Sequence, residues 1–164
     1  MRKTRMLWML PLAALLAACQ TTSQQAAQTQ PAAAAPPVEV TVPRGNALVY
    51  FYRPQAFSGS ANTYRVSING TPVADIRTGM RYAAPVAPGT VRIEAQTLAN
   101  ILNFGLGLAM MEKPSMTLAA RQGSVAYVKI TTGFAGGPQL SVVPAGQALG
   151  EMAGLKLAAA APPE

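Results

Sequence analysis

The chain has 164 residues and a formal net charge of +7, with 13 lysines and arginines, six aspartates and glutamates, one cysteine and no histidine. These counts exclude histidine-based metal sites, Ser-His-Asp triads and Cys-His pairs, and a single cysteine excludes an internal disulfide. Three basic residues lie within the first five positions, which leaves 10 basic and 6 acidic residues, a net charge of +4, in the remainder. Those 10 are scattered singly, whereas nucleic-acid binding selects a clustered basic face, so nucleic acid is not an expected partner.

The start of the chain has the layout of an export signal. Basic residues at positions 2, 3 and 5 precede an apolar run over residues 6–18, and small residues precede Cys19. This order is typical of a secretory signal peptide. A run of 13 residues is shorter than the roughly 20 that cross a bilayer as a helix. We therefore expect residues 1–18 to be a cleaved signal and not a permanent membrane span.

Leu16-Ala17-Ala18-Cys19 resembles the lipobox of bacterial lipoproteins. The resemblance implies cleavage between Ala18 and Cys19, a diacylglyceryl thioether on the Cys19 thiol, and an acylated amine. Membrane lipid, contacted through the acylated Cys19, is then the first expected partner. No cofactor is expected besides this covalent lipid. The alternative is an ordinary signal peptide with a chance cysteine. Gln20 stands where an Asp would resemble the inner-membrane retention signal of enterobacterial lipoproteins, which favours the outer membrane.

Residues 20–43 consist mainly of Gln, Thr, Ala and Pro with a single charge. Such a segment has too little apolar surface to offset its ordering entropy. We expect residues 19–43 to be a lipidated cysteine followed by a disordered tether. As a flexible coil, 24 residues would span about 25–30 Å.

The next part of the chain contains eight short strand-like segments separated by turn signals. Alternation of apolar and polar residues is clearest around Tyr64, Val66 and Ile68, which predicts a half-buried strand. Asn69-Gly70 then favours a two-residue hairpin turn. The predicted strands are 46–53, 64–69, 72–77, 80–86, 90–97, 115–120, 124–131 and 139–143. The predicted fold is all-β, an antiparallel β-sandwich of about seven or eight short strands.

Three further stretches complete the predicted organisation. Residues 144–157 carry Leu149, Met152 and Leu155 at near-helical spacing, which predicts a short helix on an edge or end of the sandwich. The folded domain is thus expected over residues 44–157, with a disordered tail at 158–164.

Residues 98–111 contain no charge and two glycines between two strands. One interpretation is a cover over an open end of the sandwich. The other is an exposed interaction patch that docks a partner or enters lipid. The apolar residues of this segment are Leu98, Ile101, Leu102, Phe104, Leu106 and Leu108.

The motifs along this part of the chain resemble those of a bacterial family catalogued as domain of unknown function 2846, many members of which are lipoproteins. The matching residues are Val49-Tyr50-Phe51-Tyr52-Arg53-Pro54, Ile68-Asn69-Gly70, Pro72-Val73-Ala74, Tyr82, Ala87-Pro88-Gly89-Thr90 and Gly123-Ser124-Val125-Ala126-Tyr127-Val128. The family is similar to the transthyretin-like or carboxypeptidase-regulatory β-sandwiches. The resemblance implies that fold and no catalytic residues.

Catalytic chemistry has little support in the sequence. Asp75 and Glu94 are the pair of carboxylates on predicted strands, more typical of solvated outer faces than of a glycosidase pair. No serine stands in a nucleophile-elbow context, Lys129 is expected on an exposed strand face, and no phosphate loop or metal-ligand cluster is evident. We expect a protein that is not an enzyme.

The sequence therefore predicts a lipoprotein of the outer membrane that presents a periplasmic β-sandwich to an envelope protein or peptidoglycan. The alternative is a module that binds glycan or another small envelope ligand through exposed tyrosines, since Tyr50, Tyr52, Tyr64, Tyr82 and Tyr127 are either core residues or a stacking face. The sequence does not determine the oligomeric state.

Overall fold

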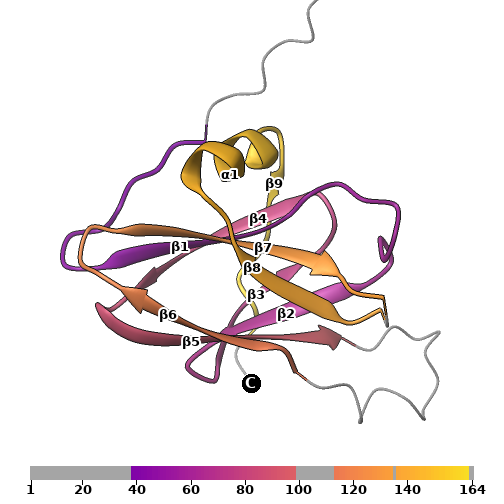
Figure 1. Cartoon of the computed structure of the whole chain (residues 1–164), viewed down its shortest axis with the longest axis horizontal. Coiled ribbons are helices and arrows are strands. Elements are labelled where there is room, and N and C mark those ends of the chain that lie inside the picture. Colours follow the sequence, from indigo (N-terminus) through magenta and orange to yellow (C-terminus); the bar gives the residue numbers. More distant parts are fainter. Residues whose placement is uncertain (1–37, 99–112, 135, 163–164) are drawn as a thin grey trace, which may run out of the picture. The chain divides into compact units, whose positions relative to one another are not determined.

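The computed structural model describes residues 38–98, 113–134 and 136–162. Within these residues, nine strands form two sheets that face each other, with one helix (Figure 1). The all-β sandwich predicted from the sequence is confirmed. No helix in this part of the chain combines the length and apolar character that crossing a bilayer requires.

The two sheets have five and four strands. The five-stranded sheet has the order β8 (Pro138–Val142), β7 (Val125–Thr132), β1 (Ala47–Arg53), β4 (Met80–Val86) and β9 (Lys156–Leu157). The four-stranded sheet has the order β3 (Thr71–Ile76), β2 (Thr63–Ile68), β5 (Gly89–Leu98) and β6 (Ser115–Ala120). Two pairings in the larger sheet, β1 with β7 and β4 with β9, are parallel, so the sandwich is mixed where the sequence predicted an antiparallel one.

Strand β1 is the central strand of the larger sheet, and all seven of its residues are buried. Val49 and Phe51 face the interior of the sandwich and pack with Tyr64, Val66 and residues of both sheets. Their neighbours along the strand belong to a second apolar cluster on the outer face of the same sheet. Both faces of β1 are therefore covered, which explains why its sequence is a continuous apolar run that ends in Arg53.

The turn at Asn69 and Gly70 confirms the predicted hairpin between β2 and β3. Both residues have positive φ, 48° and 84°, as a two-residue turn with the strand twist requires. Pro72 lies in β3, an edge strand of the smaller sheet, where a missing N–H disturbs no ladder.

The C-terminal helix differs from its prediction in length and in place. Helix α1 (Ala145–Met152) ends five residues earlier than predicted, because Gly154, with a φ of 77°, turns the chain into β9. Ala148 and Met152 of α1 pack on the outer face of the larger sheet, against Tyr50 and Tyr52 (Figure 1). The helix covers a sheet face and not an edge.

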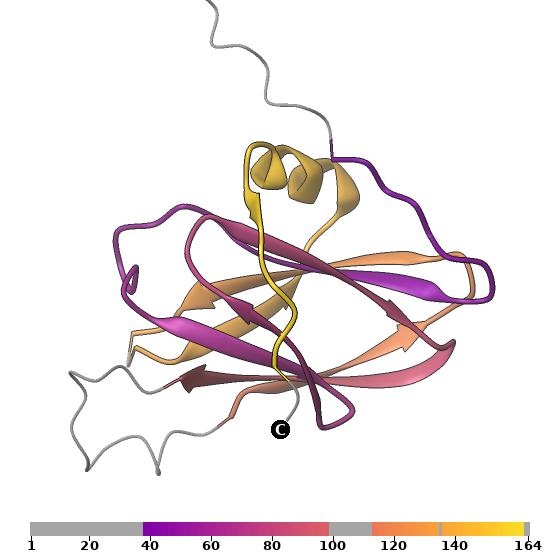
Figure 2. The same cartoon turned by 180° about the vertical axis from the view of Figure 1, so that it is seen from behind.

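The folded unit extends beyond the expected range of 44–157 at both ends. Val38, Val40 and Val42 pack against the same outer cluster as the helix, although this segment was expected to be tether. After β9, the amide of Ala161 donates to the Val73 carbonyl, and Ala160 forms a bridge with Ala74 of β3. The C-terminal segment thus runs from the larger sheet to the smaller one along one side of the sandwich (Figure 2).

Candidate functional site

The residues of the predicted lipidation site, Ala18 and Cys19, lie outside the described residues. Of the predicted apolar patch, Leu98 is described, and it ends β5 half-buried, paired with Thr63 of β2. The other members of that patch, from Ile101 to Leu108, also lie outside the described residues. The structure therefore tests neither of those two predictions.

Four of the five tyrosines belong to the interior. Tyr52 and Tyr64 are fully buried, Tyr50 and Tyr127 are 5% and 6% exposed, and Tyr82 is half-buried against the main core. Tyr50 and Tyr127 stack on each other across β1 and β7, with ring centroids 5.6 Å apart. These four tyrosines are core residues, one of the two possibilities that the sequence left open, and do not form an exposed face that could stack on sugar rings. The hydroxyl of Tyr50 donates to the Glu39 carbonyl at 2.9 Å. The ring is therefore buried while its polar hydroxyl keeps a hydrogen-bond partner.

The most unusual buried group is Arg53, at the end of β1. Arg53 is 2% exposed, and among the described residues it is the largest fully buried side chain and the one buried charged residue. Nη1 donates to the Asn62 carbonyl at 2.7 Å, and Nη2 donates to the Gly59 carbonyl at 2.5 Å and to the Thr132 hydroxyl at 3.1 Å. The guanidinium carbon also lies 4.4 Å from the ring centroid of Tyr64, within the range of a cation–π contact.

These contacts join two loops at one end of the sandwich. Residues 54–62 connect β1 to β2, and residues 133–137 connect β7 to β8. The hydroxyl of Tyr64 and the side-chain amide of Asn62 both donate to the Gly136 carbonyl, each at 3.1 Å. The Tyr64 hydroxyl also lies 2.9 Å from the Thr132 hydroxyl. We call this end, formed by residues 54–62, the turn 77–79 and the described residues of 133–137, the Arg53 end.

Gly59 shows how closely the first loop approaches β7. Its φ of 68° lies in the left-handed region, and a Cβ on it would overlap the Thr132 side chain. Any side chain there would push the loop away from Thr132 and from the Arg53 guanidinium that its carbonyl accepts. Glycine is therefore required at this position by both conformation and space.

The positive charge of Arg53 is held by neutral oxygens. Its guanidinium donates to two carbonyls and one hydroxyl, and burial lowers the pKa of this group because the charged form loses hydration. An arginine stays protonated at neutral pH even so. The arrangement is a structural clamp, in which one buried charged group binds the Gly59 and Asn62 carbonyls of the first loop and the Thr132 hydroxyl of β7.

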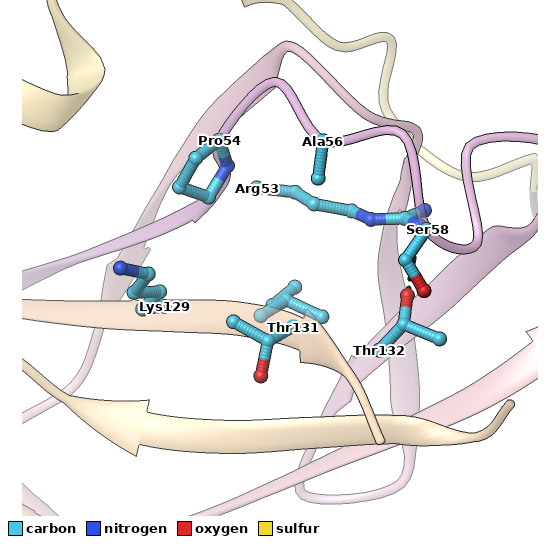
Figure 3. A pocket seen from close by; sticks show the side chains of 8 residues that line it. Arg53, Pro54, Ala56, Ser58, Lys129, Thr131 and Thr132 are labelled. Atoms are coloured by element: carbon cyan, nitrogen blue, oxygen red, sulfur yellow. Dashed lines mark hydrogen bonds between the residues drawn. The ribbon is translucent and has the colours of Figure 1, made fainter. Parts of the chain in front are cut away.

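A hollow of about 280 Å³ lies between the first loop and β7, beside Arg53 (Figure 3). It is lined by Arg53, Pro54, Ala56, Ser58, Lys129, Ile130, Thr131 and Thr132. Both cations of this lining have partners, since Lys129 contacts Glu151 at 2.9 Å. No imidazole or carboxylate, the usual bases for a hydroxyl nucleophile, lies beside the hydroxyls of Ser58, Thr131 and Thr132 among the lining residues.

A second hollow, about 340 Å³, lies near the opposite end of the sandwich. Its lining includes Ile68, Asn69 and the turn that joins β4 to β5, and it contains no charged side chain. The side-chain oxygen of Asn69 is already bound by the Arg92 amide at 2.8 Å. This hollow offers less chemistry than the one beside Arg53.

A polar cluster joins the helix to the sheet. Glu151 of α1 accepts from the Tyr52 hydroxyl at 2.9 Å, from Lys129 at 3.0 Å and from Gln147 at 2.8 Å. Hydrogen bonds from Gln147 and Lys129 hold the pKa of the Glu151 carboxyl below its ordinary value, against a smaller opposing effect of burial. Burial and the hydrogen bond to Glu151 raise the pKa of Tyr52. The cluster fixes the helix on the sheet and keeps both groups in their ordinary protonation states at neutral pH.

The carboxylates weighed as a catalytic pair are each bound to an arginine. Asp75 accepts two hydrogen bonds from Arg65, at 2.9 and 3.0 Å, and Glu94 accepts one from Arg92 at 2.7 Å. Among the described residues, no group of three His, Cys, Asp or Glu side chains could hold a metal ion. Lys129 is half-buried and paired with Glu151, not free on an exposed face as predicted.

The comparison with protein families gives a match to the model described as "Protein of unknown function (DUF2846)" over residues 43–145. The chain belongs to the DUF2846 family. The match runs from Pro43, just before β1, through β8 to the first residue of α1, so the DUF2846 part contains strands β1 to β8 and the three loops of the Arg53 end. No curated protein is detectably similar to the chain. Family membership therefore identifies the fold unit and leaves its activity open.

Sequence reasoning placed Arg53 within a DUF2846 motif but missed its role. A signal was present, because a charged residue at the end of a fully apolar central strand, directly before Pro54, has to lie either in solvent or in a polar cage. The cage itself comes from Asn62, Gly59 and Thr132, which are 9, 6 and 79 residues away. Only the fold brings Thr132 to that position.

Proposed function

We propose that this DUF2846 protein is a bacterial lipoprotein that does not catalyse a reaction and that presents its β-sandwich in the cell envelope as an interaction module. The acylated Cys19 would anchor it in the outer membrane, with the domain on the periplasmic side. Its partner would be an envelope protein or peptidoglycan. The observation that carries the proposal is Leu16-Ala17-Ala18-Cys19 directly after a basic start and a 13-residue apolar run.

The mechanism is tethering. Two or three acyl chains hold a protein at a membrane far more firmly than one chain, which gives only marginal binding. The folded unit starts contacting its own core at Val38, so 18 residues, from 20 to 37, separate it from Cys19. Treated as a flexible coil, that length spans about 20–25 Å. A domain held this close meets envelope partners at high effective concentration, so that weak contacts suffice.

The chain contains a single cysteine, which makes the anchor easy to test. The full chain is expressed in a Gram-negative host with a clickable fatty acid, beside Cys19→Ser and a matched control, Cys19→Ser with Ser23→Cys. We expect label and cleavage in the first chain alone, because the control carries a thiol outside the lipobox. Equal membrane fractions and equal labelling of all three chains would contradict the anchor.

The choice of membrane is tested at the next residue. Gln20→Asp is expected to move the lipoprotein to the inner-membrane fraction of an enterobacterial host, and the isosteric control Gln20→Asn to leave it with the outer membrane. Density-gradient separation of the two membranes measures the outcome. Retention of the native chain in the inner membrane would contradict the proposed location while leaving the anchor itself intact.

A further inference from the structure

Two phenylalanines at the Arg53 end are almost wholly in solvent. Phe57 is 98% exposed and Phe134 is 111% exposed relative to a reference residue, the highest values among the exposed large apolar residues of the described chain. Phe57 lies in the loop 54–62 and Phe134 in the loop 133–137. Single exposed apolar residues are common on protein surfaces, but apolar residues gathered at one end mark a contact.

The two loops are held together beneath these side chains. Arg53 bridges the Gly59 and Asn62 carbonyls of the first loop to Thr132, the last residue of β7 before the second loop. Asn62 and Tyr64 both bind the Gly136 carbonyl of the second loop. The exposed phenylalanines are thus carried on a fixed support, which lowers the entropy cost of inserting them together into an apolar phase.

The three loops of the Arg53 end contain no acidic residue and one basic residue. Residues 54–62 and 133–137 contain no charged side chain. The adjacent turn is bound to the first loop, because the Thr78 hydroxyl donates to the Pro54 carbonyl and accepts from the Ala56 amide. That turn contributes Arg77, which is exposed and bound to the Thr63 hydroxyl at 3.2 Å. None of the described carboxylates lies in these three loops.

We propose that the Arg53 end of the domain contacts the bilayer, with Phe57 and Phe134 at the boundary between headgroups and acyl chains and Arg77 among the phosphates. The inference rests on the proposed anchor, which makes the bilayer the apolar phase nearest to the domain. Aromatic tips with basic flanks and no carboxylates match an anionic lipid surface in both polarity and charge. An acidic protein surface could bind Arg77 but would provide no apolar environment for Phe57 and Phe134.

The test uses tryptophan as a reporter of depth. Trp8 is the chain's single tryptophan and would be removed with the signal, so Phe57→Trp and Phe134→Trp each give the mature lipoprotein one tryptophan, which is excited selectively over the tyrosines. The matched control is Ala87→Trp, in the exposed turn after β4, at the other end of that strand from the Arg53 end. Each acylated chain is placed in vesicles of phosphatidylglycerol and phosphatidylcholine with brominated acyl chains.

We expect emission from positions 57 and 134 to shift to shorter wavelength and to be quenched by the brominated lipid, and emission from position 87 to do neither. Equal behaviour at all three positions, in chains whose circular dichroism matches the native one, would overturn the inference. Flotation of the chain with the vesicles reports the anchor separately, so a floating chain without quenching contradicts the bilayer contact and not the lipid on Cys19.

A second measurement avoids any dependence on the anchor. The mature Cys19→Ser chain, without lipid, is titrated with the same vesicles, and Phe57→Ser and Phe134→Ser are each expected to lower its partition coefficient by about tenfold. Val142→Ser is the matched control, because Val142 is 52% exposed and is the last residue of β8, at the other end of that strand from the loop 133–137. Equal losses for all three serine variants would overturn the inference, since they would reflect general apolar exposure.

Discussion

Replacing Arg53 by methionine isolates the contribution of the buried clamp. Methionine has a similar length and no polar group, so Arg53→Met keeps most of the packing of the side chain stem. It removes the hydrogen bonds to the Asn62 carbonyl, the Gly59 carbonyl and the Thr132 hydroxyl, and the contact with the Tyr64 ring. The two carbonyls and the hydroxyl then remain at the Arg53 end without their charged donor.

The size of the effect follows from the balance of two quantities. A hydrogen bond to a charged group contributes about 1.5–3 kcal/mol to stability, and a desolvated cation–π contact adds about 2 kcal/mol. Against these stands the cost of burying a guanidinium that has no carboxylate partner, which the substitution removes. Three such bonds together exceed a desolvation cost of several kcal/mol by a moderate margin, so we expect Arg53→Met to lower the free energy of unfolding by about 3 kcal/mol.

The assay is urea denaturation of the mature chain, followed by circular dichroism and analysed by linear extrapolation. Arg77→Met is the matched control, since Arg77 is exposed and surface substitutions usually change stability by less than about 0.5 kcal/mol. Arg53→Lys keeps the charge on a single nitrogen that cannot reach all three acceptors, so it should fall between the two. If Arg53→Met were as stable as Arg77→Met, the clamp would contribute nothing net and the reasoning would be refuted.

Three further predictions use the same assay. Two buried nitrogens of Arg81, Nε and Nη1, have no hydrogen-bond partner in the described structure, so Arg81→Met should leave stability unchanged or raise it by about 1 kcal/mol; a loss as large as that of Arg53→Met would contradict this. Folding lowers the pKa of Glu151. The carboxylate therefore stabilises the folded state at pH values above its unfolded pKa, and this stabilisation is lost as the pH falls through its folded pKa. The difference in unfolding free energy between the native chain and Glu151→Gln should be largest near pH 7 and disappear in acid. Gly70→Ala should cost about 1 kcal/mol since Gly70 has a φ of 84°, whereas Gly150→Ala, inside α1 with open space around it, should gain about 0.5–1 kcal/mol.

Local patterns in the sequence were sufficient to predict the strands. Tyr64, Val66 and Ile76 are buried where apolar and polar residues alternate, because a strand that lies on a core has to place every second side chain inside. Asn69-Gly70 predicted its turn because few residue pairs accept positive φ at both positions. These features depend on contacts between neighbours along the chain, which a sequence records directly.

The features that the sequence did not reveal depend on contacts between distant segments. Nothing local to β1 or β7 shows that they pair in parallel, with Tyr52 opposite Lys129. Val38 and Ala160 lie in Ala- and Pro-rich stretches that were expected to be disordered, and they are ordered because the outer face of β1 and the edge of β3 provide partners. Low apolar content argues against a segment that folds alone, not against one that folds onto a surface already formed.

The boundary of the DUF2846 match has a physical consequence for this chain. The match ends at Ala145, whereas Tyr50 and Tyr52 on the outer face of β1 owe their burial to Ala148 and Met152 of α1 and to the valines before β1. A core cut at the match would leave a tyrosine-rich sheet face in water. The segments on either side of the match therefore complete the fold, and the valines among them shorten the link to Cys19. The end of the sandwich that carries Arg53, Phe57 and Phe134 lies wholly within the match, so its two loops, and not the added segments, are the place where an activity of the DUF2846 unit itself should be sought.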